Sequence, residues 1–196
     1  MRGEYVLASA NPHKLHELKL LMGDSSISSV GDIIPGWDIE ETGVTLQDNA
    51  LLKARAAVRA TGRPAIADDT GLFVKALGEA PGVYTARYAG ENCTYRDNTE
   101  KLLNSLRGER GDSRIAVFRT VIALVTPDGK EYTFTGEAEG CITEEHLGEG
   151  GFGYDPVFYS RELRKTFSQC TPAEKHSVSH RGRAMEKLRE HLENGN

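Results

Sequence analysis

Residues 114–142 read RIAVFRTVIALVTPDGKEYTFTGEAEGCI, and this stretch contains two long β-prone runs joined by a short turn. Two long β-prone runs, 114–126 and 130–142, flank Pro127-Asp128-Gly129, which has the residue types of a tight hairpin turn. The stretch therefore predicts a long antiparallel ribbon. A ribbon of this length can form a second lobe or a surface for a partner.

Ahead of the ribbon, β-prone runs alternate with helix-forming runs, which is the pattern of a mixed α/β protein. Besides the ribbon, strands are expected at residues 4–8, 27–34, 65–67 (with an extended run resuming at 72–74) and 156–159. Helices are expected from residue 15 onward and at 46–59, 98–106 and 182–192, and residues 78–88 are expected as a loop. We expect one α/β domain over residues 1–196, with a central substrate cleft between the sheet and a smaller lobe.

Composition excludes several classes of protein. The chain is 38% hydrophobic and 27% charged, and no apolar run approaches the roughly 20 residues of a membrane span. The apolar stretch near the N-terminus is too short for a secretory signal, and three widely separated cysteines indicate neither a disulfide framework nor a zinc site. We therefore expect a cytoplasmic protein. A net charge of −5 argues against broad binding to nucleic acid but leaves a small phosphorylated ligand possible.

The run Gly150-Gly151-Phe152-Gly153-Tyr154-Asp155-Pro156 has the composition of a site for a flat heterocycle. Glycine allows close approach of the backbone, the two aromatic rings offer faces, and the carboxylate and backbone amides offer hydrogen bonds to a base edge. The alternative is a glycine-rich turn whose aromatic rings pack into the core. The run alone does not separate the two.

A second candidate, Ser9-Ala10-Asn11-Pro12-His13-Lys14, lies between the first strand and the first helix. Backbone N–H groups at a helix start suit a phosphate. The segment lacks the glycine spacing of a Walker loop, and taken alone it favours an N-capped helix with a solvated lysine.

Acidic and basic residues supply two more candidates. Glu40, Glu41, Asp68 and Asp69 come from two loops and could converge on Mg²⁺, with one acid for the metal and one for the attacking water. The alternative is a solvated surface and an ordinary turn. The basic cluster near the end of the chain could hold phosphate or a purine carbonyl, or it could be a solvated face; it comprises Lys165, Lys175, His176, His180, Arg181 and Arg183. On the second helix, Lys53 or Arg55 could reach a phosphate, and the alternative is that both are merely exposed, as most helix lysines are.

Taken together, these motifs resemble the inosine triphosphate pyrophosphatase family from the first strand to the last helix. The motifs that carry the resemblance are Ser9-x-Asn11-x-x-Lys14, Glu41-Thr42-Gly43, Asn49-Ala50-x-x-Lys53-Ala54, Ala67-Asp68-Asp69-Thr70-Gly71-Leu72, Pro81-Gly82-Val83-Tyr84-Thr85-Ala86-Arg87-Tyr88, Gly151-Phe152-Gly153-Tyr154-Asp155-Pro156 and Ser179-His180-Arg181-Gly182.

The resemblance implies Mg²⁺-dependent hydrolysis of ITP, dITP and XTP to the monophosphate and pyrophosphate, by a homodimer with an elongated mixed sheet, flanking helices and two lobes around the cleft. It makes Asp69 the general base and a metal ligand. Glu41 is preferred over Glu40 as the second metal ligand because it precedes Thr42-Gly43, and which of Glu40, Glu41 and Asp68 supports Asp69 stays open. The resemblance implies that Thr70 touches the substrate. The other substrate-binding residues implied are Ser9, Ala10, Asn11, Pro12, His13, Lys14 and Lys53 at phosphate, Phe152, Gly153, Tyr154 and Asp155 around the base, and Lys175, His180 and Arg181 at its 6-keto and 2-position groups.

Two other functions remain open on the sequence. A pyrophosphatase with a different base range would use the same phosphate machinery with another base pocket. A nucleotide sensor without turnover would use the glycine loop for binding and the acids for structure.

Overall fold

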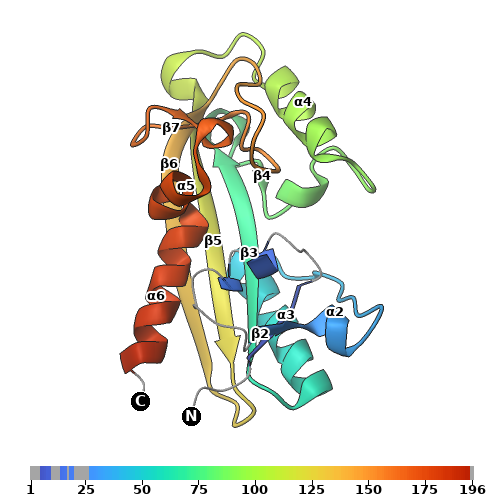
Figure 1. Ribbon diagram of the computed structural model, residues 1–196. Helices are drawn as coiled ribbons and strands as arrows, with labels where there is room; N and C mark the ends of the chain where they lie inside the picture. Colours follow the sequence, from blue (N-terminus) through green and yellow to red (C-terminus); the bar gives the residue numbers. More distant parts are fainter. Residues whose placement is uncertain (1–4, 10–13, 17, 20–26, 195–196) are drawn as a thin grey trace. The chain divides into compact units, whose positions relative to one another are not determined.

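The computed structural model describes residues 5–9, 14–16, 18–19 and 27–194 (Figure 1). The strands within these ranges are β1 (Tyr5–Leu7), β2 (Ile27–Ser29), β3 (Ala65–Val74), β4 (Pro81–Gly82), β5 (Ile115–Val125), β6 (Glu131–Ile142), β7 (Phe158–Ser160) and β8 (Lys165–Thr166). The α-helices given bounds there are α2 (Val30–Ile33), α3 (Leu46–Thr61), α4 (Tyr95–Ser105), α5 (Pro172–Val178) and α6 (His180–Asn194). Short 3₁₀ turns occur at Lys75–Leu77, Thr85–Arg87, Gly111–Arg114 and Phe167–Gln169.

The strands form one mixed sheet in the order β2-β1-β3-β5-β6-β7-β8, with β4 paired to β3. β1 runs parallel to β2 and to β3, whereas β6, β7 and β8 pair antiparallel. In the β5–β6 turn, Thr126 N donates to Lys130 O at 3.0 Å. The mixed α/β sheet with flanking helices and the long ribbon predicted from the sequence are confirmed.

The residue contacts divide the chain into two compact units. The first unit contains the chain up to Asp69, residues Thr120–Thr135 and the chain from Ala184 onward. The second unit contains Thr70–Arg119 and Gly136–Arg183. Each unit has its own core.

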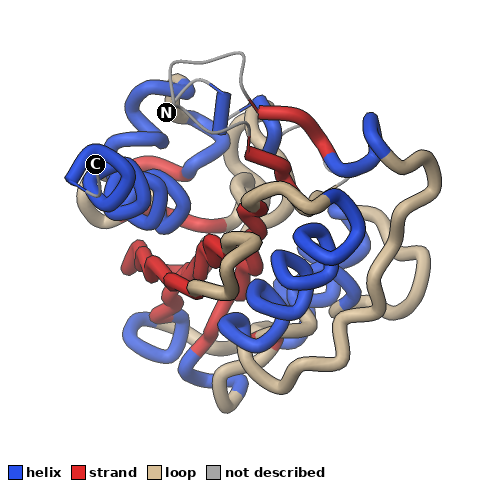
Figure 2. Tube along the Cα trace, turned by 90° about the horizontal axis from the view of Figure 1, so that it is seen from below, coloured by secondary structure: helices blue, strands red, loops and turns tan. Residues whose placement is uncertain are grey.

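In the first unit, alternation along β3 decides which face each side chain takes, because successive side chains of a strand point to opposite faces. Ile66 belongs to a core to which α6 contributes Ala184, Met185 and Leu188. Figure 2 shows the helix that ends at the C-terminus running beside the strands. The buried members of that core are Leu7, Leu18, Ile27, Ile66, Ile122, Leu124, Ala184, Met185 and Leu188. Ala65 and Ala67, also buried, take the other face, where α3 brings a row of small buried alanines.

In the second unit, aromatic rings build the core. Phe118 lies 4.6 Å from Phe158 and 6.2 Å from Phe167 between ring centroids. Leu102 and Leu106 of α4 and its C-terminal cap complete the same cluster, and both are fully buried. This core supports the glycine-rich loop that follows β6.

Local capping explains where the structure departs from the expected elements. Residues 30–33 are a short helix rather than strand, because the Ser29 side chain accepts from Gly31 N and caps it. Helix α4 begins at Tyr95, earlier than expected, because Thr94 and Asp97 form a capping box. Helix α6 likewise begins at His180, two residues ahead of the expected start.

Three further departures involve strands and a helix not foreseen. β3 runs unbroken from Ala65 to Val74, so the acidic pair lies inside a strand instead of at its end. Within the expected loop 78–88, Pro81–Gly82 pairs with β3 as β4. Helix α5 follows its own capping box at Thr171 and Glu174.

No helix in the described part of the chain is both long and apolar enough to cross a membrane.

The approach of α5 and α6 gives a stability prediction. A Cβ added at Gly182 would lie 1.9 Å from the His176 carbonyl oxygen, so Gly182→Ala forces the two helices apart. We expect the variant to lose about 1–3 kcal/mol of unfolding free energy in urea denaturation. Gly31→Ala is the control, because its Cβ would meet nothing nearer than the Ser29 hydroxyl at 3.6 Å. Equal stability of the two variants would contradict the packing account.

Candidate functional site

In the first unit, one buried lysine joins two carboxylates. Lys53 of α3 is 8% exposed, and its Nζ lies 2.6 Å from Glu41 Oε1 and 3.3 Å from Asp69 Oδ1. Asp69 follows Ala65 and Ala67 on the β3 face that α3 covers, and Glu41 comes from the loop before α3. Segments distant in sequence are thus held at one ammonium group.

Asn49, which the sequence analysis did not assign to the site, fixes the other oxygen of Asp69. Its Nδ2 donates to Asp69 Oδ2 at 3.2 Å, and its Oδ1 accepts from Gly43 N at 2.8 Å. Asn49 is 2% exposed and lies one helical turn before Lys53, so both side chains leave the same face of α3. A polar residue four positions before a lysine on an otherwise apolar helix face was the available signal.

Asp68 points to the opposite face of β3 from Asp69. There Lys14 Nζ lies 2.9 Å from Asp68 Oδ1. Glu40 is exposed, and the described residues contain no group of three or more acidic, His or Cys side chains arranged for a metal ion. The four acids therefore do not converge; Glu41 and Asp69 do.

The pKa values of both Asp69 and Lys53 are raised in this cluster, for different reasons. Burial raises the pKa of Asp69, and this outweighs the lowering by the Lys53 ammonium. Burial by itself lowers the pKa of Lys53, but the nearby carboxylates, that of Asp69 foremost, outweigh burial and leave the pKa raised. Lys53 thus stays charged, while Asp69 holds a proton more readily than an exposed aspartate, as a general base requires.

Only part of the expected phosphate segment lies in the described residues. The Ser9 carbonyl accepts from the Ser29 hydroxyl at 3.0 Å, and Lys14 is helical. Ala10, Asn11, Pro12 and His13 lie outside the described residues.

In the second unit, a buried carboxylate organises the glycine-rich loop. Asp155 is 3% exposed, and its Oδ2 accepts from Phe152 N at 2.8 Å and from Lys175 Nζ at 2.6 Å. Gly151 has φ +75°, and a Cβ there would lie 2.2 Å from the same oxygen, so only glycine fits. Asp155 therefore fixes the loop and Lys175, rather than leaving both carboxylate oxygens for a base edge.

Two cations lie at the Phe152 ring. Lys175 Nζ lies 4.5 Å and Arg181 Cζ 5.6 Å from the ring centroid. Arg181 Nη2 donates to Thr70 Oγ1 at 3.3 Å. Phe152, Lys175, Arg181 and Thr70, all predicted from the sequence, are thus brought together, and they combine an aromatic surface with donors for a carbonyl oxygen.

Two other predicted residues belong to the core. Tyr154 is 4% exposed, and its hydroxyl donates to the Thr85 carbonyl at 2.9 Å. The ring of His180 is stacked on Phe118 at 4.4 Å. Both alternatives for the glycine-rich run are therefore realised in part: Tyr154 packs inward, and Phe152 lies among the cations. Gly153, with φ +61° and open space around its missing Cβ, provides the turn between them.

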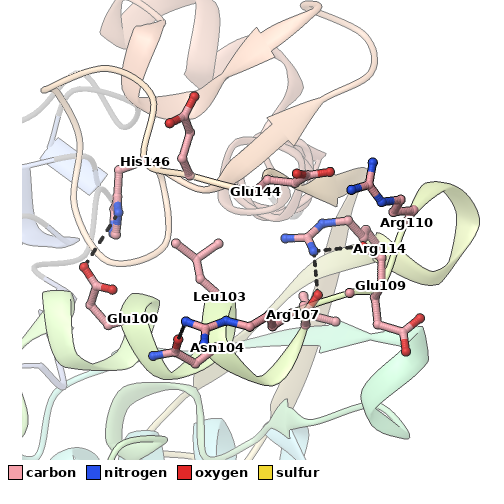
Figure 3. Close-up of a pocket in the computed structure, with 12 residues that line it drawn as sticks. Glu100, Leu103, Asn104, Arg107, Glu109, Arg110, Arg114, Glu144 and His146 are labelled. Atoms are coloured by element: carbon pink, nitrogen blue, oxygen red, sulfur yellow. Dashed lines mark hydrogen bonds and ion pairs between the residues drawn. The ribbon is translucent and has the colours of Figure 1, made fainter.

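A cavity of about 370 Å³ in the second unit lies among other residues (Figure 3). Its charged lining is mixed, with Arg107, Arg110 and Arg114 beside Glu100, Glu109, Glu144 and Glu145. Arg114 is occupied by backbone carbonyls, donating to Ile142 O at 2.7 Å and Leu106 O at 2.9 Å. No predicted site residue lines this cavity, and its mixed charge favours neither an anion nor a cation.

Comparison with known proteins gives consistent matches over nearly the whole chain. A sequence model described as the Ham1 family matches residues 5–191. The chain is similar to the dITP/XTP pyrophosphatase of Photorhabdus laumondii, with 46% identity over 96% of this chain and 98% of the relative. It is also similar to the enzyme of that name from Staphylococcus epidermidis, with 44% identity over 97% of this chain and 96% of the relative.

Solved structures agree. The Ham1 protein of Staphylococcus aureus matches with a TM-score of 0.89 and 43% identity, covering 98% of this chain and 99% of that one. The nucleoside-triphosphatase / dITP/XTP pyrophosphatase of Mycobacterium abscessus matches with a TM-score of 0.78 and 42% identity, covering 94% of this chain and 97% of that one. The resemblance drawn from the motifs is confirmed.

The double contact of Asn49 gives a prediction. Asn49→Ala leaves Asp69 Oδ2 and Gly43 N without the partner they have in the structure, at a buried position. We expect a loss of about 1–3 kcal/mol of unfolding free energy in urea denaturation. Asn104→Ala, an exposed helix asparagine bonded to Arg107, should change stability by less than about 0.5 kcal/mol. If Asn49→Ala behaves like this control, Asn49 does not hold the cluster.

Proposed function

Because the chain belongs to the Ham1 family, it is a hydrolase acting on nucleoside triphosphates, and we propose that it cleaves ITP, dITP and XTP to the nucleoside monophosphate and pyrophosphate. The observation that carries the proposal is the buried Asp69 carboxylate, whose two oxygens contact Lys53 and Asn49. A carboxylate so oriented, with its pKa raised, suits the deprotonation of water.

The reaction we propose is attack of water on the α-phosphorus. Asp69 accepts a proton from the water while the water oxygen forms a bond to the α-phosphorus. The bond from the α-phosphorus to the oxygen that bridges to the β-phosphorus breaks, and pyrophosphate leaves with that electron pair. Asn49 keeps the carboxylate oriented, and Lys53 supplies a positive charge close to it.

Mg²⁺ is part of this proposal. Glu41 and Asp69 already share one cation, the Lys53 ammonium, and their carboxylate oxygens are the hard ligands that Mg²⁺ prefers together with water and phosphate oxygens. These two residues would hold the ion. When bound, it neutralises charge that develops on the phosphate oxygens. Ser9, Ala10, Asn11, Pro12, His13, Lys14 and Lys53 would bind the triphosphate.

The second unit supports the choice of base. Phe152 would stack on the purine, and Lys175 and Arg181 would donate to its 6-oxygen. The 6-amino group of adenine would leave these donors unpaired, which is costly in a buried site. Thr70 and Gly153 would lie beside the bound base. Asp155 would orient Lys175. Tyr154 and His180 would support the loop from the core.

We further propose, on the family resemblance, a cytoplasmic homodimer. The net charge of −5 supports a small-molecule substrate over nucleic acid.

Product analysis with an Asp69 variant tests the function. Wild-type protein with Mg²⁺ should release pyrophosphate from ITP, dITP and XTP but not from ATP, and chelator should stop the reaction. Asp69→Asn should lower kcat by about 10²- to 10⁴-fold without unfolding, because asparagine has nearly the same shape. Asp128→Asn in the exposed β5–β6 turn is the control.

Orthophosphate as product would contradict attack at the α-phosphorus. Nucleotide binding without turnover would favour the sensor.

A second prediction concerns the base. Lys175→Met removes a donor beside Phe152, so kcat/KM for ITP should fall about 10- to 100-fold while the value for ATP changes much less. Lys187→Met, at an exposed lysine of α6, should leave the ITP-to-ATP ratio of kcat/KM as in the wild type. An equal fall for both nucleotides would mean that Lys175 does not read the 6-position.

A further inference from the structure

We propose that Tyr95 lines the nucleobase site together with Phe152 and contributes directly to the affinity for a purine. This inference rests on the proposed function, because it takes Phe152 as the residue that stacks on the base. It assigns a base-contacting role to a residue outside the motifs that carry the family resemblance.

The geometry of two aromatic rings carries the proposal. The Tyr95 and Phe152 ring centroids are 6.2 Å apart, and the ring planes meet at 46°. Tyr95 is 50% exposed, although it contacts a ring flanked by Lys175 and Arg181. An exposed tyrosine is ordinary by itself. Tyr95 differs because its ring extends the aromatic surface of Phe152 beside two donors, so a flat ligand could contact a larger aromatic area.

The start of α4 holds Tyr95 in place. Thr94 N donates to Asp97 Oδ2 at 2.7 Å, and Asp97 N donates to Thr94 Oγ1 at 3.2 Å, which closes the capping box around Tyr95. One turn on, the buried Asn98 accepts from Ala89 N at 2.7 Å. The backbone that carries the ring is therefore fixed before a ligand binds, and little ordering is needed on binding.

The angle between the two rings means that one flat base cannot stack on both. A flat base cannot lie parallel to two planes that meet at 46°, so a base stacked on Phe152 meets Tyr95 at its edge or at the adjoining sugar. A bicyclic purine extends farther than a pyrimidine and covers more of such a corner. Tyr95 should therefore favour purine over pyrimidine nucleotides, whereas the donors discriminate among purines.

A second exposed tyrosine, Tyr84, shows that exposure alone does not place a tyrosine at the proposed base site. Tyr84 is 57% exposed, and the contact found for its ring is the Arg87 guanidinium at 5.3 Å. Among the described ring pairs, Phe152 is matched with Tyr95. The inference follows from this pairing.

Binding of reaction products separates the base from the phosphates. IMP, UMP and inorganic pyrophosphate are titrated by calorimetry into the full-length protein with Mg²⁺ present. Tyr95→Ala should weaken IMP binding about 3- to 10-fold, the range expected for one aromatic contact, and weaken UMP binding less. Pyrophosphate binding should stay unchanged. The KM for ITP should rise by a similar factor with kcat nearly constant.

Two variants control for the helix and for the hydroxyl. Arg96→Ala changes the next residue of the same turn, whose side chain is 83% exposed and pairs with Glu100, and it should bind IMP as the wild type does. Tyr95→Phe keeps the ring and should retain IMP affinity within about twofold, since the contact is through the ring face and edge.

The outcomes are distinct. Unchanged IMP binding in Tyr95→Ala overturns the inference, as does an equal loss for IMP and pyrophosphate, which would indicate a general structural effect. Turnover of ITP by the wild type tests the proposed function separately, so failure of the Tyr95 role and failure of the proposed function give different results.

Discussion

The proposed chemistry of the first unit depends on the ion pairs that the Lys53 ammonium group makes with Glu41 and Asp69. A buried charge is tolerated only when it is paired, and Lys53 is paired with carboxylates from a loop and from β3. The pairing fixes the loop at Glu41, and it orients Asp69 so that Asn49 reaches the remaining oxygen. Without the ammonium, the carboxylates of the buried Asp69 and the partly exposed Glu41 would repel each other across the same space.

The second unit uses the opposite arrangement, with one buried carboxylate holding a cation and a backbone turn. Asp155 accepts from Lys175 and from the Phe152 amide, so the position of the ring and that of the donor beside it are set by one group. Gly151 permits this because no side chain stands between the loop and the carboxylate. Each unit thus places its proposed reactive or binding groups through a single charge that contacts two segments.

Features that depend on residue type were mostly predicted from the sequence. The directions in which individual side chains point were mostly not. The long ribbon and the helix expected over residues 46–59, which is α3 (Leu46–Thr61) in the structure, were predicted because turn residues and helix formers act locally. The acids at 68 and 69 were predicted as a pair, but their opposite directions required β3 to be one unbroken strand. Tyr154 and Phe152 look equivalent in sequence, and only packing against the Phe118 core separates them. Asn49 was quoted within a motif but was given no role at the site, because its contact with Asp69 spans 20 residues and depends on how α3 packs against β3.

The alternation along β3 constrains how the chain can change in length. Asp68 meets Lys14 on one face and Asp69 meets Lys53 on the other, while Ile66 enters the core beneath α6. Inserting or deleting one residue between Ala65 and Asp68 would turn every following side chain to the wrong face and exchange the two lysine partners. Length changes here are compatible with the charges only in steps of two residues, so descendants of this sequence should vary β3 by substitution rather than by insertion.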